Sequence, residues 1–396
     1  MGSGVGVLAV EGRERPRTDR RTLAVAAFVA SAACLVVVRL LVTTKFGDLR
    51  IYRLEGLQVL HGHDLYGHLP GVAGYATYPP FAGVVFCLYA VLSLGVLEVV
   101  NAVLTLAALV WTATAACRLV GARVDVPTAG FAFAALFIWA EPVFTTFGYG
   151  QINLYLLALV LWDFTRPEDS RWHRWRGLGV GLAAGIKVTP AVFLVYLFLT
   201  RRFAFGFRAL GTFAATLGVS LLVNAHDTVK FWTDYLFDVH RVGRLENAVN
   251  QTVRGWAVRA DHTRASNPVE TALVVLVAVA GLAVAVFAYR RLGEAWGLTS
   301  CALTGLMCSP IAWSHHWVWC VPVLVLLWFE ARVWFAVGAA VFFSFAVWWI
   351  PHSGQELHLA AWQVAVSGWY VLFGLAYLAL TAWRCRSQPV GRGDRI

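Results

Sequence analysis

The stretch AWGLTSCALTGLMCSPIAWSHHWVWCVPVLVLLWF occupies residues 295–329 and contains no Asp, Glu, Lys or Arg. A helix needs about 20 apolar residues to cross roughly 30 Å of hydrocarbon, so this stretch is long enough to enter a membrane. Four more stretches without these charged residues follow the same pattern: 126–140, 142–162, 333–355 and 357–383. Their repetition along one chain predicts an all-α polytopic membrane protein.

The composition of the whole chain supports this class. Of 396 residues, 59% are hydrophobic and only 14% are charged. A soluble domain carries about 25% charged residues, so the deficit indicates a surface that faces lipid. We therefore expect membrane lipid around the protein and no nucleic-acid partner.

A hydropathy window predicts about twelve transmembrane helices. The predicted spans are 22–44, 79–97, 99–117, 127–140, 147–164, 177–200, 209–225, 269–289, 295–310, 314–329, 333–351 and 361–383. The predicted organisation is a cytoplasmic N-terminal tail over 1–21, a transmembrane domain over 22–383 and a cytoplasmic basic tail over 384–396.

Arginines in the short polar segments predict the orientation, because cytoplasmic loops are enriched in Lys and Arg. The N-terminal stretch, the pairs Arg201–Arg202 and Arg290–Arg291, and the C-terminal tail favour the cytoplasm. Alternation then places the long loops 45–78 and 226–268 outside. The basic loop 165–176 contradicts simple alternation, so we expect either a re-entrant helix between 79 and 164 or a break within 177–200.

The first outer loop opens with Asp48, directly after the first predicted span. The residues that follow alternate leucines and tyrosine with Arg50, Arg53 and Glu55, a pattern typical of a helix in the membrane interface. Asp48 has two interpretations at this point: an N-cap of that helix or a functional carboxylate.

Polar residues also interrupt the apolar spans. Tyr78 precedes a double proline, and Gln151 and Asn153 lie within an uncharged run. Amides in lipid either join helices or line a wet cavity. Lys187 lies within the segment GLAAGIKVTPAVF. A lysine inside a span indicates a functional site, unless its long stem carries the ammonium group to the interface.

Two further segments carry polar side chains near span ends. The second outer loop holds Asn250, Gln251 and Arg254, which can hydrogen-bond hydroxyl groups and pair with an anion through Arg254. His315 and His316 lie between tryptophans. Adjacent histidines on a helix point in different directions, so we expect one to face a cavity and the other to pack against Trp. The alternative is a structural histidine at the membrane edge.

These motifs resemble glycosyltransferase family 87, the polyprenyl-phosphate-mannose-dependent enzymes of the GT-C class, and are most similar to its actinobacterial α-(1→2)-mannosyltransferase branch. The segments that carry the resemblance are GDLRIY (47–52), YATYPP (75–80), GQINL (150–154), GLAAGIKVTP (181–190), NQTVRG (250–255) and SPIAWSHHWVW (309–319). They follow the family's order and cover all but roughly the first 20 residues and the last dozen.

The resemblance implies a role for each matching residue. Asp48 corresponds to the catalytic carboxylate of the first outer loop and would act as general base. Positively charged or donor groups would bind the departing phosphate. The candidates for that phosphate are Arg50, Lys187, Arg254, His315 and His316, and the candidates for sugar hydroxyls are Tyr52, Tyr78, Gln151, Asn153, Asn250 and Gln251. No metal site and no cofactor are expected.

The implied function is inverting transfer of mannose from polyprenyl-phosphate mannose to a mannosylated lipid or lipoglycan, forming α-(1→2) linkages. The implied location is the cell membrane, with the active site on the extracytoplasmic face. Two alternatives stay open: an arabinofuranosyltransferase using polyprenyl-phosphate arabinose, and a transporter or flippase for a lipid-linked sugar. A transporter would place its polar groups near the bilayer midplane in discontinuous helices.

Overall fold

The computed structural model describes residues 17–41, 46–69, 71–72, 74–167, 169–265 and 267–387. Helices and connecting loops make up these residues, and the one β contact among them is an isolated bridge between Asn250 and Trp313. The predicted all-α class is therefore confirmed. Most of the predicted tails, 1–21 and 384–396, lies outside the described residues.

Within the described residues, four helices are long and apolar enough to cross a membrane. They are α1 (Arg17–Leu41), α4 (Leu94–Val120), α10 (Phe203–Val223) and α13 (Pro268–Leu292). Their ends follow ordinary capping chemistry: the Asn267 side chain accepts a hydrogen bond from the Val269 amide at the start of α13, and Gly121 ends α4 in the left-handed conformation.

Two sharply bent helix pairs raise the number of possible spans to six. The first pair is α5 (Val126–Phe137) with α6 (Glu141–Tyr149), bent by 78°, and the second is α17 (Ala361–Ser367) with α18 (Trp369–Ser387), bent by 64°. The length criterion thus gives four to six spans rather than about twelve. A hydropathy window averages composition and does not register the breaks that interrupt the remaining apolar stretches.

The remaining helices are shorter. The apolar ones are α3 (Pro80–Ala90), α7 (Asn153–Phe164), α8 (Leu178–Ile186), α9 (Val192–Leu199), α14 (Glu294–Cys308), α15 (Cys320–Glu330) and α16 (Arg332–Phe343). The others are α2 (Gly47–Leu60), α11 (Ala225–Lys230), α12 (Val253–Ala260) and the turns η1 (His173–Trp175), η2 (Thr189–Ala191), η3 (Phe231–Tyr235), η4 (Val239–Arg241), η5 (Ser314–Trp319) and η6 (Ala346–Trp348).

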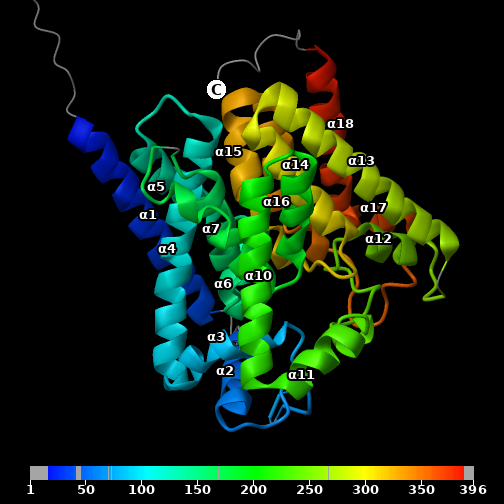
Figure 1. Cartoon of the computed structure of the whole chain (residues 1–396). Helices are drawn as coiled ribbons and strands as arrows, with labels where there is room; N and C mark the ends of the chain where they lie inside the picture. The colour runs from blue at the N-terminus through cyan, green and yellow to red at the C-terminus, as the bar shows by residue number, and fades with distance from the viewer. Residues whose placement is uncertain are drawn as a thin grey trace, which may run out of the picture.

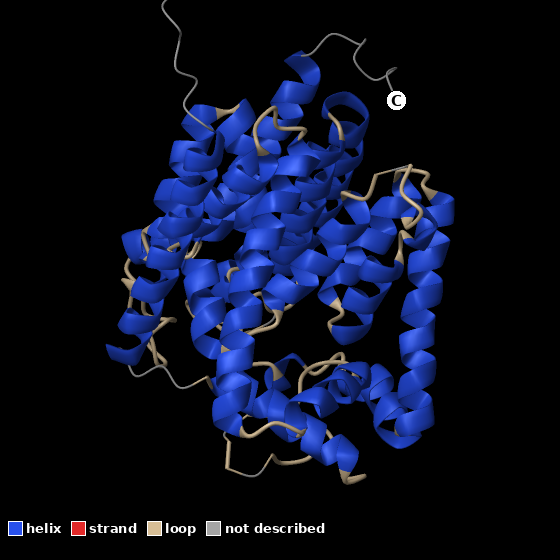
Figure 2. Ribbon diagram, turned by 90° about the vertical axis from the view of Figure 1, so that its left-hand side faces the viewer, coloured by secondary structure: helices blue, strands red, loops and turns tan. Residues whose placement is uncertain are grey.

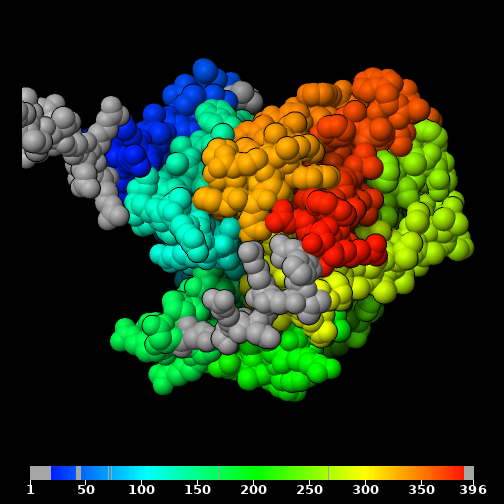
Figure 3. Space-filling model, turned by 90° about the horizontal axis from the view of Figure 1, so that it is seen from above, coloured from blue at the N-terminus to red at the C-terminus, as the bar shows by residue number. Residues whose placement is uncertain are grey.

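The core of the bundle surrounds α15, in which every residue from Cys320 to Leu327 is buried. Such all-round burial is expected for a helix that is apolar on every side. In contrast, α1 and α13 expose most of their apolar surface. Seen from above in Figure 3, the C-terminal segment (red) lies against the yellow segment of α13, in agreement with the contacts between α13 and α18.

The two ends of the bundle differ in character. At one end lie α2 and α11 (Figure 1), and short helices run across the direction of the long ones (Figure 2). At the opposite end, a cavity of about 1330 Å³ is lined by arginines from separate segments. They are Arg176, Arg201, Arg202, Arg208, Arg290, Arg291 and Arg384.

The basic loop 165–176 belongs to this arginine-rich end. Arg176 lines its cavity, and Arg208 donates a hydrogen bond to the Arg174 carbonyl at 2.7 Å. Of the two explanations that the sequence left open, the break within 177–200 is present between α8 and α9 at Lys187. The 78° bend at α5–α6 fits either a broken span or a re-entrant segment. The loop is therefore on the same side as the other basic segments.

Candidate functional site

Three interruptions of helices bring polar residues from distant parts of the chain together. Gly150 ends α6 with φ +71°; Lys187 follows α8 in an extended conformation; and Ser309 and Pro310 separate α14 from η5. Non-helical backbone at membrane depth is tolerated where it is buried in protein or lines a cavity. All three interruptions border one cavity.

This cavity has a volume of about 550 Å³ and lies among α2, the loop after it, the three interruptions and the 226–268 loop. Seven of the twelve site residues predicted from the sequence line it: Asp48, Tyr52, Tyr78, Gln151, Lys187, His315 and His316.

Asp48 lies in the first turn of α2 without capping it. Phe46 is the N-cap residue, and no side chain caps this helix. The Asp48 carboxylate instead accepts a hydrogen bond from Gln151 Nε2 at 2.5 Å. Burial raises the pKa of Asp48, and this rise is opposed by the Gln151 hydrogen bond and by the charge of Lys187. The N-cap interpretation of Asp48 is therefore wrong.

Gln151 is held by two tyrosines. Its Oε1 accepts hydrogen bonds from Tyr52 Oη at 2.8 Å and from Tyr78 Oη at 3.2 Å. The two hydroxyls lie 3.0 Å apart, and the rings stack at 5.6 Å between centroids. This network fixes which end of the amide faces Asp48, so Gln151 presents its N–H to the carboxylate.

Lys187 is buried, with 8% of its surface exposed. Its Nζ lies 3.0 Å from His316 Nε2, 3.1 Å from Asn153 Oδ1 and 3.3 Å from Tyr78 Oη. These contacts exclude a side chain that extends along the surface to the interface. They hold the ammonium group at the wall of the cavity, facing the same space as Asp48.

Both histidines of the pair line the cavity, so the expectation that one would pack against Trp is wrong. The His315 ring meets Tyr149 edge-on at 5.4 Å, and its backbone carbonyl accepts hydrogen bonds from Thr146 and Asn153. The 3₁₀ turn η5 differs from the expected α-helix, and the two imidazoles stand at 86° with centroids 4.8 Å apart.

Asn153 lies behind Lys187, in a neighbouring cavity of about 50 Å³ shared with Lys187 and His316. Its side chain joins the Lys187 ammonium group to the His315 carbonyl. The hydrogen bonds of the Asn153 side chain are therefore with Lys187 and His315, two residues that line the larger cavity.

Besides Asn153, four of the predicted residues are not among those that line the cavity. Arg50 faces Glu98 at 3.8 Å, and Arg254 faces Glu270 at 3.9 Å. The Asn250 side chain bonds the Ala312 amide and the Leu245 carbonyl.

Gln251, the fourth of these residues, is fully buried. Its side chain donates to the carbonyls of Ala248 and Ser367 and accepts from the Tyr370 amide. The amides at 250 and 251 therefore connect the 226–268 loop to the bundle.

Sequence reasoning missed three charged residues around the cavity. Glu55 and Arg241 line it, and Glu141 lies behind it with 0% exposure. Glu141 accepts hydrogen bonds from Ser314, Trp348 and Tyr370 and so holds η5 in place. Glu55 was detectable, because it lies on the same face of α2 as Asp48, two turns further on. No sequence signal distinguishes Arg241 from other loop arginines.

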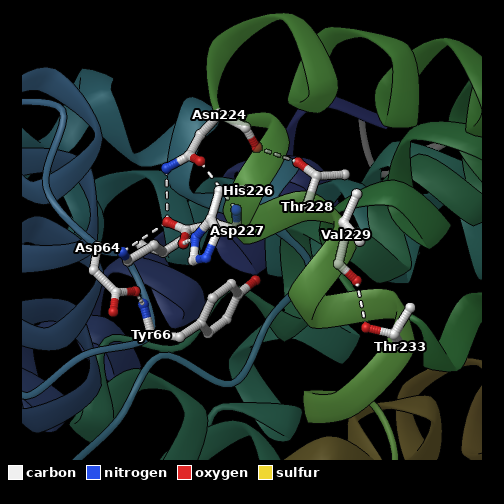
Figure 4. Close-up of polar contacts among 9 residues, drawn as sticks. Asp64, Tyr66, Asn224, His226, Asp227, Thr228, Val229 and Thr233 are labelled. Atoms are coloured by element: carbon white, nitrogen blue, oxygen red, sulfur yellow. Dashed lines mark hydrogen bonds and ion pairs between the residues drawn. The ribbon is translucent and has the colours of Figure 1, made fainter.

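Beside the cavity, the loop after α2 meets α11 (Figure 4). The buried carboxylate of Asp227 accepts a hydrogen bond from the Leu65 amide at 2.9 Å and another from Asn224 Nδ2 at 2.7 Å. Asp64 accepts from the Tyr66 amide at 2.8 Å. These bonds fix Tyr66 at the junction of the two segments.

The chemistry available in this cavity is a carboxylate beside an amide donor, with an ammonium group and two imidazoles lining the same space. No group of three His, Cys, Asp or Glu residues suited to a metal occurs in the part of the chain that the structure describes. The arrangement can accept a proton at Asp48 and bind an anion near Lys187 and His316.

Comparison with known proteins agrees with this geometry. The model of glycosyltransferase family 87 matches residues 76–310. A protein of Mycobacterium tuberculosis (strain CDC 1551 / Oshkosh) is 38% identical over 300 residues, covering 72% of this chain and 66% of that protein. Its name is polyprenol-phosphate-mannose-dependent alpha-(1-2)-phosphatidylinositol pentamannoside mannosyltransferase.

A second relative, from Mycolicibacterium smegmatis (strain ATCC 700084 / mc(2)155), is 31% identical over 374 residues, covering 84% of this chain and 82% of the relative. It is named polyprenol-phosphate-mannose-dependent alpha-(1-2)-phosphatidylinositol mannoside mannosyltransferase. No solved structure matches the chain significantly. The family match and these identities establish that the chain is a member of glycosyltransferase family 87.

Proposed function

We propose that the protein transfers mannose from a polyprenyl-phosphate-mannose donor to a phosphatidylinositol mannoside or related mannosylated lipid, forming an α-(1→2) linkage with inversion. The observation that carries this proposal is the position of Asp48, beside Gln151 and in one cavity with Lys187 and His316. The names of the relatives support the donor, the acceptor class and the linkage.

The reaction needs a base and an anion site on opposite sides of the sugar. Asp48 removes the proton from the acceptor hydroxyl as its oxygen attacks the anomeric carbon, and the bond to the carrier phosphate breaks. The departing phosphodiester becomes a monoester with more negative charge, which the Lys187 ammonium group and a histidine of the pair stabilise. Tyr52, Tyr78 and Gln151 supply hydrogen bonds to sugar hydroxyls.

The proposed setting is the cell membrane, with more spans than the length criterion gives and with this cavity on the extracytoplasmic face. The arginine-rich end would then face the cytoplasm, as the enrichment of Lys and Arg in cytoplasmic loops favours. α2 would lie at the membrane interface, where both lipid substrates present their headgroups. Arg50 and Arg254, outside the cavity, would contact lipid headgroups rather than the reacting phosphate.

The arabinofuranosyltransferase and transporter alternatives have less support. The interrupted helices would also suit a transporter, but the relatives are named as mannosyltransferases.

The test is incubation of the purified protein with polyprenyl-phosphate mannose or polyprenyl-phosphate arabinose and a panel of mannosylated lipids. We expect mannose transfer alone, an α-(1→2) product by linkage analysis and undiminished activity in EDTA. Transfer of arabinose would favour the arabinofuranosyltransferase. Movement of the donor across a vesicle membrane without any sugar transfer would favour the transporter.

A further inference from the structure

Arg241 ends the turn η4 and lines the same cavity as Asp48 and Lys187. Its guanidinium group lies over three tyrosine rings, at 4.2 Å from the Tyr235 centroid, 4.7 Å from that of Tyr75 and 6.0 Å from that of Tyr66. One of its nitrogens, Nη2, donates to the Tyr66 carbonyl at 2.7 Å. The guanidinium position is thus set by aromatic faces and one carbonyl group.

Arg241 forms no ion pair with any described carboxylate, although other arginines of the 226–268 loop do. Arg254 pairs with Glu270 and Arg264 with Glu246. The Arg241 Nε is buried without a hydrogen-bond partner among the described residues. An arginine has five N–H donors, so this group retains donors and an unneutralised charge inside a cavity.

Two of the tyrosines beneath Arg241, Tyr66 and Tyr235, are held by packing. Tyr66 stacks on Phe231 at 5.6 Å and contacts Tyr235 at 4.9 Å between centroids, and Asp64 and Asp227 hold its backbone segment (Figure 4). A guanidinium group fixed on aromatic faces presents its edge to planar or tetrahedral oxyanions with little further ordering.

The charges around the cavity suit two anions. Lys187, beside His316, forms one positive position, and Arg241 forms a second on the side of the 226–268 loop. Each lipid substrate of the proposed reaction carries a phosphodiester, and such an anion is costly to hold near hydrocarbon unless it is paired.

We propose that Arg241, on its platform of Tyr66, Tyr75 and Tyr235, is a second anion site that binds the phosphodiester of a lipid substrate and so orients that substrate in the cavity. This inference rests on the proposed transfer reaction only for the identity of the lipid. Because Lys187 and His316 face the leaving group, the acceptor's phosphodiester is the expected occupant.

The test compares Arg241→Met with the matched control Arg244→Met. Arg244 is an exposed arginine of the same loop that does not line the cavity. We expect Arg241→Met to raise the KM for a phosphatidylinositol mannoside acceptor by a factor on the order of 10–100, the usual effect of losing a charge-assisted hydrogen bond. The control variant should behave as wild type, and Arg241→Lys should fall between.

Two further substrates identify the source of the anion. A dodecyl α-mannoside acceptor has no phosphate, so its KM should not change in Arg241→Met if the site binds the acceptor's phosphodiester. If the KM for polyprenyl-phosphate mannose rises instead, the site binds the donor's phosphodiester. Unchanged KM values for both phosphate-bearing lipids, or an equal rise with the dodecyl mannoside, would overturn the anion site.

Direct binding separates this inference from the transfer reaction. Binding of polyprenyl phosphate and of a phosphatidylinositol mannoside to the detergent-purified protein can be measured by thermal shift, without any turnover. A smaller shift in Arg241→Met for one of them supports the site even if the protein transfers another sugar. Shifts equal to those of wild type for both lipids would contradict it.

Discussion

Lys187 occupies the centre of the hydrogen-bond network around the cavity. Its Nζ contacts Tyr78, Asn153 and His316 and shares the cavity with Asp48. An ammonium group at this depth is stable only because oxygen and nitrogen acceptors surround it. The same group is therefore positioned to meet a phosphate that replaces one of these acceptors.

Replacing Lys187 by Met retains most of the side-chain volume and removes the charge. We expect Lys187→Met to raise the donor KM or lower kcat on the order of 10-fold or more, because a buried phosphate would lose a charge-assisted hydrogen bond. The KM for a short-chain acceptor should stay the same. Donor affinity equal to that of wild type would exclude Lys187 from the phosphate site.

Glu55 introduces a pH dependence of stability. Burial raises the pKa of Glu55 from 4.5 to about 8, with a smaller contribution from the charge of Asp48. Between these values the folded protein binds a proton that the unfolded chain does not, so the contribution of Glu55 to stability is present below pH 4.5 and is lost as the pH rises through about 8.

Glu55→Gln replaces the neutral acid with a neutral amide. We expect the Tm difference between Glu55→Gln and wild type to be more favourable to the variant at pH 9 than at pH 6, because only wild type ionises a buried carboxyl. Thermal unfolding in one detergent at both pH values measures this. A difference independent of pH would show that Glu55 does not titrate in the folded state over this range.

Among the elements, α2 and α3 pack at unusually short distance, and this contact places Asp48. A Cβ atom on Gly56 would lie 2.1 Å from the Phe86 carbonyl oxygen. Phe86 also stacks on Tyr52 at 4.5 Å between centroids. The position of α2, and with it the cavity, therefore depends on the absence of a side chain at Gly56.

Gly56→Ala should force α2 away from α3. We expect a loss of about 1–3 kcal/mol in the free energy of unfolding, the usual cost of overpacking a core, and a lower transfer rate in the protein that folds. Gly211→Ala is the control, because nothing lies within 4 Å of a Cβ atom at that position of α10. Equal Tm values for the two variants would contradict the close packing.

Sequence and structure agree best where a polar residue interrupts an apolar run. Gln151, Lys187 and the histidine pair were predicted in this way, and all line the cavity. The face of the helix on which each residue lies was predicted less well. Arg50 lies about 200° around α2 from Asp48, whereas Tyr52 and Glu55 lie on the same face as Asp48. A helical projection of the segment would have favoured Glu55 over Arg50.

Residues whose role depends on tertiary contacts could not be identified from local sequence. Asn250 and Gln251 look like sugar ligands because they are amides in a polar loop, yet their side chains bond backbone groups of distant segments. The spans show the same limit, because a hydropathy window counts apolar residues and does not register the bends at α5–α6 and α17–α18.

On the scale of the whole molecule, the arginine-rich end and the cavity end are opposite, which predicts a fixed orientation in the membrane. His63 is exposed at the cavity end, and Ser170 lies in the basic loop. In intact cells, a membrane-impermeant maleimide should label His63→Cys but not Ser170→Cys, which should react only after the membrane is opened. Labelling of the unsubstituted protein, which contains seven cysteines, gives the background. Labelling of Ser170→Cys in intact cells would reverse the orientation.

The central claim is that mannose transfer takes place in the cavity where Asp48 faces Lys187 and His316, with Asp48 as the base. Single-turnover transfer by Asp48→Asn, with donor binding measured in parallel, tests it most directly. The account predicts a transfer rate lower by a factor on the order of 10²–10⁴, the usual value of a positioned base, with donor binding and Tm retained. Near-normal turnover by Asp48→Asn would contradict the account and direct attention to Asp64, the next acid along that loop after Glu55.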